Sequence, residues 1–239
     1  YDDVATLEGV ELQEVIESAY AADGIEETIV ITRTNWRASE FNAAIRSRIL
    51  YREEELCRDE LLMVAKNNYY WSTKVRGLDF IANGDTARVE RVYGTEERYG
   101  LRFADVLLRL PYRDVDVECK IVLDSLVSNS PALTAEDAKR LFEGCLNDPD
   151  HVVPSMPYSA RVRRLRKDPY FNALQVKYGY AVTCHKAQGG QWRNVVVDLT
   201  GIPAEALTTV DLYRWLYTAT TRATEALIYL NPSGFRLRE

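Results

Sequence analysis

Helix and strand signals alternate near both ends of the chain, and this alternation constrains the fold more than any other feature. Residues 11–24 carry apolar side chains at the three- and four-residue spacing of an amphipathic helix, and Gly24 is placed to end it. The apolar run 27–33 predicts a buried strand, and 35–51 predicts a second helix that Asn35 can cap. This order is typical of an α/β layer structure.

The same pattern returns near the other end of the chain. The predicted elements there are strands at 173–183, 194–201 and 226–232, with a helix that begins near residue 204. We therefore predict one α/β domain with a parallel sheet, split in the sequence into residues 1–56 and 174–239.

The middle of the chain, residues 57–173, has a different pattern. Short strand-like segments separated by turn signals predict a small antiparallel β-barrel; they lie at 61–68, 80–94, 102–110 and 115–126. Asn83-Gly84-Asp85 predicts a type I′ hairpin turn. A helix capped by Thr134 should follow Pro131. We predict that this all-β and helical segment is inserted into the α/β domain.

Composition excludes several classes of protein. A chain of 239 residues that is 46% hydrophobic can bury one large core or two modest ones. Its net charge of −6 argues against a dedicated duplex binder but permits a local nucleic-acid groove. Four cysteines without a CxxC pair, and only two histidines, argue against structural zinc and suit a reducing cytoplasm. No apolar run approaches the roughly 18 residues of a membrane span.

Three polar clusters adjoin the predicted strands of the α/β domain: Thr32–Asn35, the stretch VTCHKAQGGQW at 182–192, and Tyr217–Ala223. Ligands of parallel sheets bind outside the carboxyl ends of the strands. We therefore expect Arg33, Gln188 and Arg222 to converge on one edge and point outward. Taken singly, each cluster also fits a solvated arginine, a polar helix end or a turn. Cys184 beside His185 also fits a thiol nucleophile, although adjacent strand residues face opposite ways.

Together, the clusters resemble a known family. YAVTCHKAQGGQW with VVVDL resembles motif V of superfamily-one DNA helicases of the RecD and Dda branch, LYTATTRA resembles motif VI, and IVITRTN resembles motif IV. LLMVAKNNYY and IANGD resemble the SH3-like barrel between motifs IV and V. The resemblance implies a UvrD-like C-terminal helicase domain: a RecA-like lobe of the P-loop NTPase type, interrupted by an SH3-like barrel and helices.

The resemblance also implies roles for individual residues. Arg222 and Arg33 would supply cations to the γ-phosphate of ATP, with Arg222 as the arginine finger, a role that suits a permanently charged, forked side chain. The other implied contacts are Gln188 and Gly189 with the phosphates, Gln191 with the ribose, and Thr183, His185 and Lys186 with single-stranded DNA. Gly189 and Gly190 would let the ligands approach the backbone. The chain departs from the common family pattern at Gly190 and Gln191.

Two stretches of the insertion have alternative interpretations. Lys66–Trp71 combines a cation, Asn67, Asn68 and aromatic rings, so it suits either DNA binding by stacking or a barrel turn with inward-packed rings. The basic run 161–167 suits either a solvated helix anchored by Val162 and Leu165 or a stripe that follows phosphates.

The chain lacks a Walker A sequence and an evident acidic pair for magnesium, and it begins with Tyr1. We therefore expect the C-terminal half of a longer cytoplasmic ATP-dependent DNA helicase. ATP and Mg²⁺ would be held with an N-terminal RecA-like lobe, and the chain alone would be inactive. The family likeness implies 5′-to-3′ movement on single-stranded DNA in repair or recombination. The alternative is a non-catalytic module that binds single-stranded nucleic acid or another protein.

Overall fold

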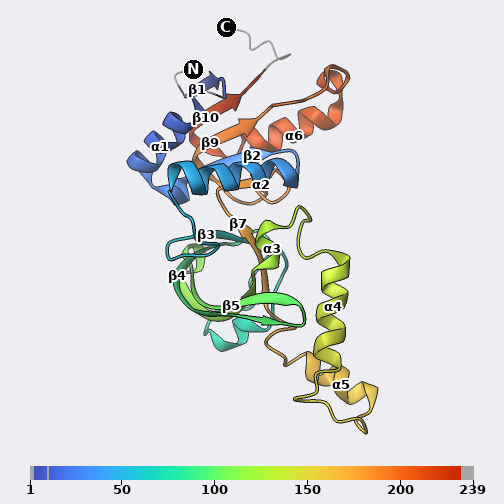
Figure 1. Cartoon of the computed structure of the whole chain (residues 1–239). Coiled ribbons are helices and arrows are strands. Elements are labelled where there is room, and N and C mark those ends of the chain that lie inside the picture. The colour runs from blue at the N-terminus through green and yellow to red at the C-terminus, as the bar shows by residue number, and fades with distance from the viewer. Residues whose placement is uncertain (1–2, 10, 233–239) are drawn as a thin grey trace. The chain divides into compact units, whose positions relative to one another are not determined.

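The computed structural model describes residues 3–9 and 11–232, which fold into two compact units (Figure 1). Unit 1 contains the described residues up to Glu53 and those from Gly179 onward, and unit 2 contains Glu54–Tyr178. Among the described residues, no helix has the length and apolar character needed to cross a bilayer.

Unit 1 is built on a five-stranded sheet with the order β1-β10-β9-β2-β8. All neighbouring strands in this sheet are parallel, as predicted. The strands are β1 (Val4–Leu7), β2 (Thr28–Thr32), β8 (Ala181–Thr183), β9 (Trp192–Asp198) and β10 (Ala223–Leu230). The buried apolar residues of β2 and β9 form the centre of the sheet.

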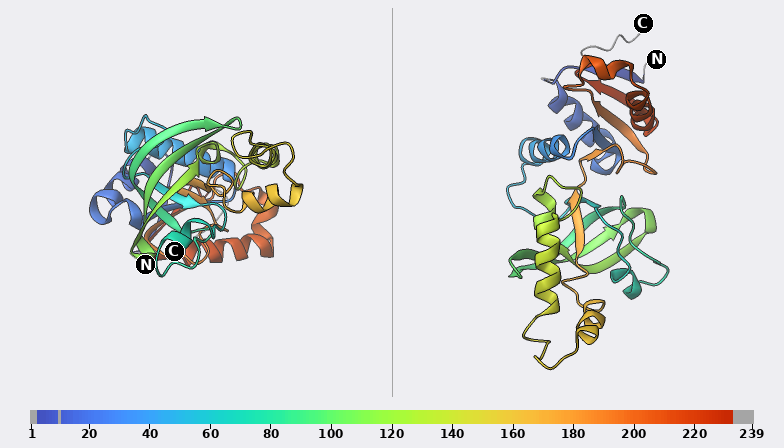
Figure 2. Two further views of the ribbon diagram at one scale, coloured as in Figure 1. Left: turned by 90° about the horizontal axis from the view of Figure 1, so that it is seen from below. Right: turned by 90° about the vertical axis from the view of Figure 1, so that its right-hand side faces the viewer.

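Helices cover both faces of this sheet (Figure 2). Helices α1 (Leu12–Asp23) and α2 (Asn35–Ala44), the latter extended by a π-helical turn at Ile45–Ile49, lie on one face. Helix α6 (Val210–Thr220), preceded by the 3₁₀ turn Ala204–Thr208, lies on the other. Right-handed crossovers require this arrangement, because the chain moves across the sheet in one direction through α1 and α2 and in the opposite direction through α6.

The helix ends follow their local sequence signals, with one correction. Gly24 ends α1 with a φ of 94°, as predicted. The predicted cap of α2 is wrong by one residue: Thr34 caps the helix by accepting a hydrogen bond from the backbone N–H of Arg37, and Asn35 is the first helical residue. Threonine in an extended conformation is an efficient N-cap, so the hydroxyl takes the position predicted for the amide.

Unit 2 contains a closed barrel with the order β3-β4-β5-β6-β7. Its strands are β3 (Leu61–Val64), β4 (Thr86–Arg98), β5 (Leu101–Leu110), β6 (Val115–Val122) and β7 (Leu174–Tyr178). The barrel is not purely antiparallel as predicted, because β6 and β7 are parallel neighbours. Residues 174–178 also lie in this barrel rather than in the α/β unit. A parallel neighbour requires a long crossover, and the helical segment between β6 and β7 supplies it.

The crossover between β6 and β7 contains α3 (Asp124–Val127), α4 (Ala135–Leu146) and α5 (Tyr158–Leu165). Thr134 caps α4 as predicted, accepting a hydrogen bond from the N–H of Asp137 at 3.1 Å. Leu165 is buried and Val162 is packed against the same apolar cluster, so α5 is anchored by the two residues that the sequence predicts.

The turn before β4 differs from its prediction. The N–H of Asp85 donates to Ala82 O at 3.1 Å, and Gly84 has a φ of 95°. Asn83 has no positive φ, whereas a type I′ turn needs positive φ at both central residues. The type I′ prediction is therefore wrong. The remaining short 3₁₀ turns are Ile25–Glu27, Trp71–Lys74 and Pro111–Arg113.

Candidate nucleotide and nucleic-acid site

Strands β2 and β8 end side by side at the carboxyl edge of the unit 1 sheet, where Thr32 pairs with Thr183. Both threonines are buried, and the N–H of Cys184 donates to Thr32 O at 3.1 Å. Arg33 follows β2 and is exposed. Its side chain forms no hydrogen bond or ion pair with any residue that the structure describes. This edge therefore presents an available cation next to the start of the 182–192 stretch.

Two further residues at this edge escape prediction from the sequence. Trp36, in the first turn of α2, is 55% exposed. Arg37 binds buried Asp198 at the end of β9 through Nε at 2.9 Å and Nη2 at 3.3 Å, and these hydrogen bonds raise the pKa of Arg37. The sequence signals for these two residues were an aromatic residue, Trp36, directly after the polar cluster 32–35, and an acid, Asp198, at the end of an apolar run. An exposed ring beside an exposed arginine suits a base and its phosphate.

Residues 184–191 carry the chain from the carboxyl edge to the opposite, amino edge, where β9 begins. The backbone N–H groups of Lys186 and Ala187 both donate to Thr183 O, at 2.9 and 3.1 Å, so the segment starts as a helical turn. Gly189 then takes a φ of 86°, which redirects the backbone. One short segment thus connects the two edges of the sheet.

Arg222 lies at the amino edge, directly before β10. Its Nε donates to Thr218 O at 3.0 Å, Nη1 to Gly190 O at 3.1 Å and Nη2 to the Thr221 hydroxyl at 3.0 Å. Described residues therefore accept hydrogen bonds from three of the roughly five N–H donors of the guanidinium, and two donors on the terminal nitrogens have no partner among them. The guanidinium forms no ion pair with a carboxylate among the described residues. Neutral oxygen atoms therefore position the guanidinium, and no described carboxylate balances its positive charge, so it can bind an anion.

The predicted convergence of Arg33, Gln188 and Arg222 on one edge is wrong. Arg33 lies at the carboxyl edge, whereas Arg222 precedes Ala223, which pairs with the first residue of β9 at the amino edge. The five residues of β2 separate these edges by roughly 16 Å at about 3.3 Å per residue. Gln188 is exposed on the connecting segment. The topology explains the position of Arg222. Because β10 is parallel to β9, α6 must bring the chain back to the amino edge before β10 begins, and Arg222 lies directly before β10.

Contacts and backbone conformation within the protein explain why residues 189 and 190 are glycines, whereas the sequence predicted that ligands approach them. A Cβ on Gly190 would lie 2.3 Å from Cη2 of Trp192, so the indole ring occupies the space of a side chain. Gly189 has open space at its Cβ position, but its positive φ is a conformation that L-residues rarely adopt. Packing and backbone conformation therefore account for both glycines without a ligand. Gln191 follows them and is exposed.

Cys184 and His185 do not form a nucleophilic pair. Burial raises the pKa of the Cys184 thiol, although nearby Arg222 acts in the opposite direction. The thiol donates to Trp215 O at 3.6 Å, while the His185 side chain is exposed. A reactive cysteine needs a lowered pKa and access to solvent. This arrangement supports a structural role for Cys184.

Lys186 is the predicted DNA contact with the most unusual environment. Burial lowers the pKa of its ammonium group to about 8, because desolvation disfavours the charged form. The side chain is only partly exposed. Its charge therefore changes in a pH range where an ordinary lysine stays protonated.

Asn67 and Asn68 lie in unit 2, where both side chains stabilise a turn. The Asn67 Oδ1 accepts a hydrogen bond from the N–H of Asn83 at 2.7 Å. Asn68 donates to Asn172 O at 2.8 Å and accepts hydrogen bonds from the N–H groups of two following residues. These contacts support the barrel-turn interpretation of the stretch, and the binding of DNA by Asn67 and Asn68 stays a prediction.

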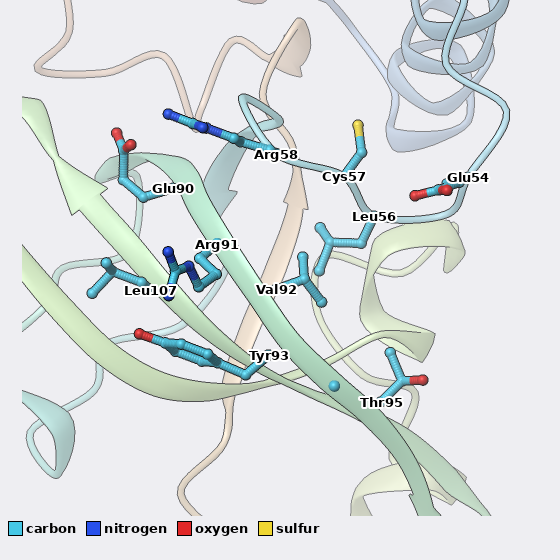
Figure 3. Close-up of a pocket in the computed structure, with 11 residues that line it drawn as sticks. Glu54, Leu56, Cys57, Arg58, Glu90, Arg91, Val92, Tyr93, Thr95 and Leu107 are labelled. Carbon is cyan, nitrogen blue, oxygen red and sulfur yellow. The ribbon is translucent and has the colours of Figure 1, made fainter.

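A pocket of about 840 Å³ lies on the barrel, between the segment before β3 and the exposed part of β4 (Figure 3). It carries both charges, from Arg58 and Arg91 and from Glu54 and Glu90, and includes no predicted site residue. Among the described residues, no group of three or more His, Cys, Asp or Glu side chains is arranged to hold a metal ion.

The parallel sheet with helices on both faces defines unit 1 as a three-layer α/β lobe, the architecture expected of the predicted RecA-like lobe. Residues 178–230, which contain the connecting segment, α6 and β10, match the UvrD-like helicase C-terminal domain. This match confirms the predicted resemblance to the C-terminal part of superfamily-one helicases. It does not distinguish the RecD and Dda branch, which stays a prediction.

Solved structures of helicases resemble the chain at low sequence identity. Pif1 helicase from Bacteroides in complex with ADP-AlF3 and ssDNA is 14% identical, with a TM-score of 0.45, over 92% of this chain and 44% of its own. Pif1 helicase from Candida albicans is 12% identical, with a TM-score of 0.41, over 96% and 55%. The chain therefore spans about half the length of these helicases. No curated protein matches the sequence.

Proposed function

We propose that this chain is the second motor lobe, with an inserted barrel, of an ATP-dependent DNA helicase. The match of residues 178–230 to a helicase C-terminal domain supports this function. The observation that carries the proposal is the segment 184–191, which joins the carboxyl edge to Arg222 at the amino edge. A segment that contacts DNA at its start and nucleotide at its end can couple hydrolysis to movement along a strand.

In this proposal the amino edge faces the nucleotide. Arg222 acts as the arginine finger, because two of its N–H donors are not used by any described residue and can bind phosphate oxygens in a fork. Gln188, Gly189 and Gln191 lie on the segment that leads to this arginine. ATP with Mg²⁺, held mainly by a separate RecA-like lobe, would supply the phosphoryl group that is transferred to water.

The carboxyl edge faces single-stranded DNA. Thr183, His185 and Lys186 begin the connecting segment there, and Arg33 and Trp36 flank it from β2 and α2. Cations beside an exposed aromatic ring suit a strand whose phosphates are bound while a base stacks. Because Arg33 and Arg222 lie at opposite edges, we assign Arg33 to the DNA and not to the nucleotide.

The test uses the full-length protein that contains this chain. We expect ATP hydrolysis stimulated by single-stranded DNA, and we expect Arg222→Ala to lower kcat by roughly a thousandfold or more while sparing DNA binding, because an arginine finger acts mainly on the transition state. The purified 239-residue chain should hydrolyse no ATP. Near-wild-type turnover in Arg222→Ala would exclude the finger assignment. A protein that binds single strands without any ATPase would favour the non-catalytic module.

A further inference from the structure

The basic run 161–167 of unit 2 divides into two sets of side chains that do different things. Arg161 and Arg164 point inward: Arg161 donates to Asn147 Oδ1 at 3.0 Å, and Arg164 pairs with buried Asp168 at 3.0 Å and donates to Cys145 O. These two cations join α5 to the end of α4 and to the chain that follows α5. They are part of the fold of the insertion.

The other three cations point outward. Arg163, Arg166 and Lys167 are exposed, and none forms an ion pair with a residue in the described part of the chain. Their spacing of three and four residues places them on one side of α5 and its C-terminal turn, with neighbouring Cβ atoms about 5–6 Å apart. The chain as a whole has a net charge of −6, so this group of cations without acidic partners forms a local region of positive charge on an acidic protein.

A fourth cation comes from the barrel turn next to α5. The Tyr70 hydroxyl donates to Lys167 O at 3.2 Å, and the Lys74 ammonium lies 5.7 Å from the centre of the Tyr70 ring. Tyr70 therefore contacts both Lys74 and the backbone of Lys167. The Asn172 carbonyl, which accepts hydrogen bonds from Asn68 and Trp71, holds the barrel turn against the chain after α5.

We propose that Arg163, Arg166, Lys167 and Lys74 form a surface on unit 2 that binds the phosphate backbone of duplex DNA. Helix α5, from which this α5 surface is mainly built, lies at one end of α4 (Figures 1 and 2). Duplex DNA carries one negative charge per about 1.7 Å of its axis, so closely spaced cations can contact neighbouring phosphates. The proposal is independent of the motor function proposed for unit 1.

The two rings next to Lys74 favour a duplex over a single strand as the ligand of the α5 surface. Single-strand sites combine cations with ring faces on which bases stack. Here the Lys74 ammonium lies over the rings of both Trp71, at 4.3 Å, and Tyr70, and Trp71 is also buried. A protein can bind duplex DNA without sequence preference through contacts with the phosphate backbone alone.

The experiment measures binding of a labelled blunt-ended duplex to the 239-residue chain by fluorescence anisotropy at several salt concentrations. We expect Arg163→Ala/Arg166→Ala to reduce duplex affinity at least about tenfold at low salt. The slope of log K against log[salt] should fall in magnitude by roughly 1.8, at about 0.9 for each lost phosphate contact. Arg163→Lys/Arg166→Lys should keep most of the slope, because the charge is retained.

The matched control is Arg58→Ala/Arg113→Ala, which removes the same charge from two other exposed arginines of unit 2. This variant should bind duplex with the wild-type slope. A parallel titration with a single-stranded oligonucleotide should give unchanged affinity in Arg163→Ala/Arg166→Ala, which separates this surface from the DNA edge of unit 1. Absence of duplex binding, equal losses in both double variants, or an equal loss of single-strand affinity would each overturn the proposal.

Discussion

The two edges of the unit 1 sheet lie at opposite ends of the same strands, yet their side chains have different chemistry. At the carboxyl edge the exposed side chains include Arg33, Trp36 and His185, and the described ion pair that reaches β9 there joins partly exposed Arg37 to the buried carboxylate of Asp198. At the amino edge, the partners of Arg222 among the residues that the structure describes are carbonyl and hydroxyl oxygens. One edge suits a strand with bases and phosphates, and the other suits a compact anion.

We infer from this difference that the position of an arginine along its strand, more than its residue type, determines which ligand it can reach. Arg33 follows β2 and Arg222 precedes β10. Two arginines that look equivalent in the sequence therefore lie at the carboxyl edge and the amino edge of the sheet, respectively. The contrast between the two edges makes three predictions, in decreasing order of expected effect.

The largest stability effect is expected at the carboxyl edge, from Arg37→Ala. The substitution leaves the buried Asp198 carboxylate without its guanidinium, which should lower the free energy of unfolding by about 3 kcal/mol. Urea denaturation of the chain measures this change. Arg214→Ala, which breaks an exposed pair with Asp211 at 3.6 Å, should change stability by less than about 1 kcal/mol. Equal effects would mean that the buried pair does not organise this edge.

A smaller effect is expected at the amino edge, from Gly190→Ala. The new methyl group would overlap the Trp192 indole and destabilise unit 1 by about 1–3 kcal/mol. Trp192→Phe removes the ring atoms that a Cβ would touch, so a double-mutant cycle should show that most of the cost depends on the indole. A cost that is the same in both backgrounds would show that packing against Trp192 is not the reason for glycine.

The smallest effect is the pH dependence of single-strand binding through Lys186. Because the pKa of this lysine is about 8, raising the pH from 7 to 9 removes most of its charge and should weaken binding roughly two- to fivefold. Lys186→Arg stays charged and should remove this dependence. Titrations of a labelled oligonucleotide at both pH values provide the measurement, and an identical pH profile in both proteins would disprove the role of Lys186.

Unfolding does not offer an alternative explanation for this loss of binding. The folded pKa of Lys186 lies below the ordinary lysine value of 10.5, so the penalty for burying its charge is complete below about pH 8 and is relieved as the pH rises toward 10.5. In that window the unfolded chain binds more protons at this group, and the contribution of Lys186 to stability therefore increases with pH.

The sequence predicts the architecture well, because the relevant signals are local. Apolar periodicity identifies α1, a continuous apolar run identifies β2, and turn-separated strands identify the barrel, since each pattern depends on neighbouring residues. The parallel pairing of β6 with β7 was not predictable, because it depends on where the crossover helices return the chain. The same limit explains why residues 174–178 were expected in the wrong unit.

The candidate site was only partly predictable. The motifs identify Arg222 and the segment 184–191, but they carry no information on which edge each residue occupies. Following the helix that precedes β10 as a crossover would have placed Arg222 at the amino edge. The pair of Arg37 with Asp198, and the contact of Gly190 with Trp192, join residues whose relation appears only after packing.

The most direct test of the account compares Arg33→Ala with Arg222→Ala in the full-length protein that contains this chain. Steady-state ATP hydrolysis and single-strand affinity are measured for both variants. We expect Arg222→Ala to lose turnover by roughly a thousandfold with DNA affinity retained, and Arg33→Ala to lose DNA affinity with kcat at saturating DNA retained. A comparable loss of kcat in both variants would contradict the assignment of the two edges to different ligands.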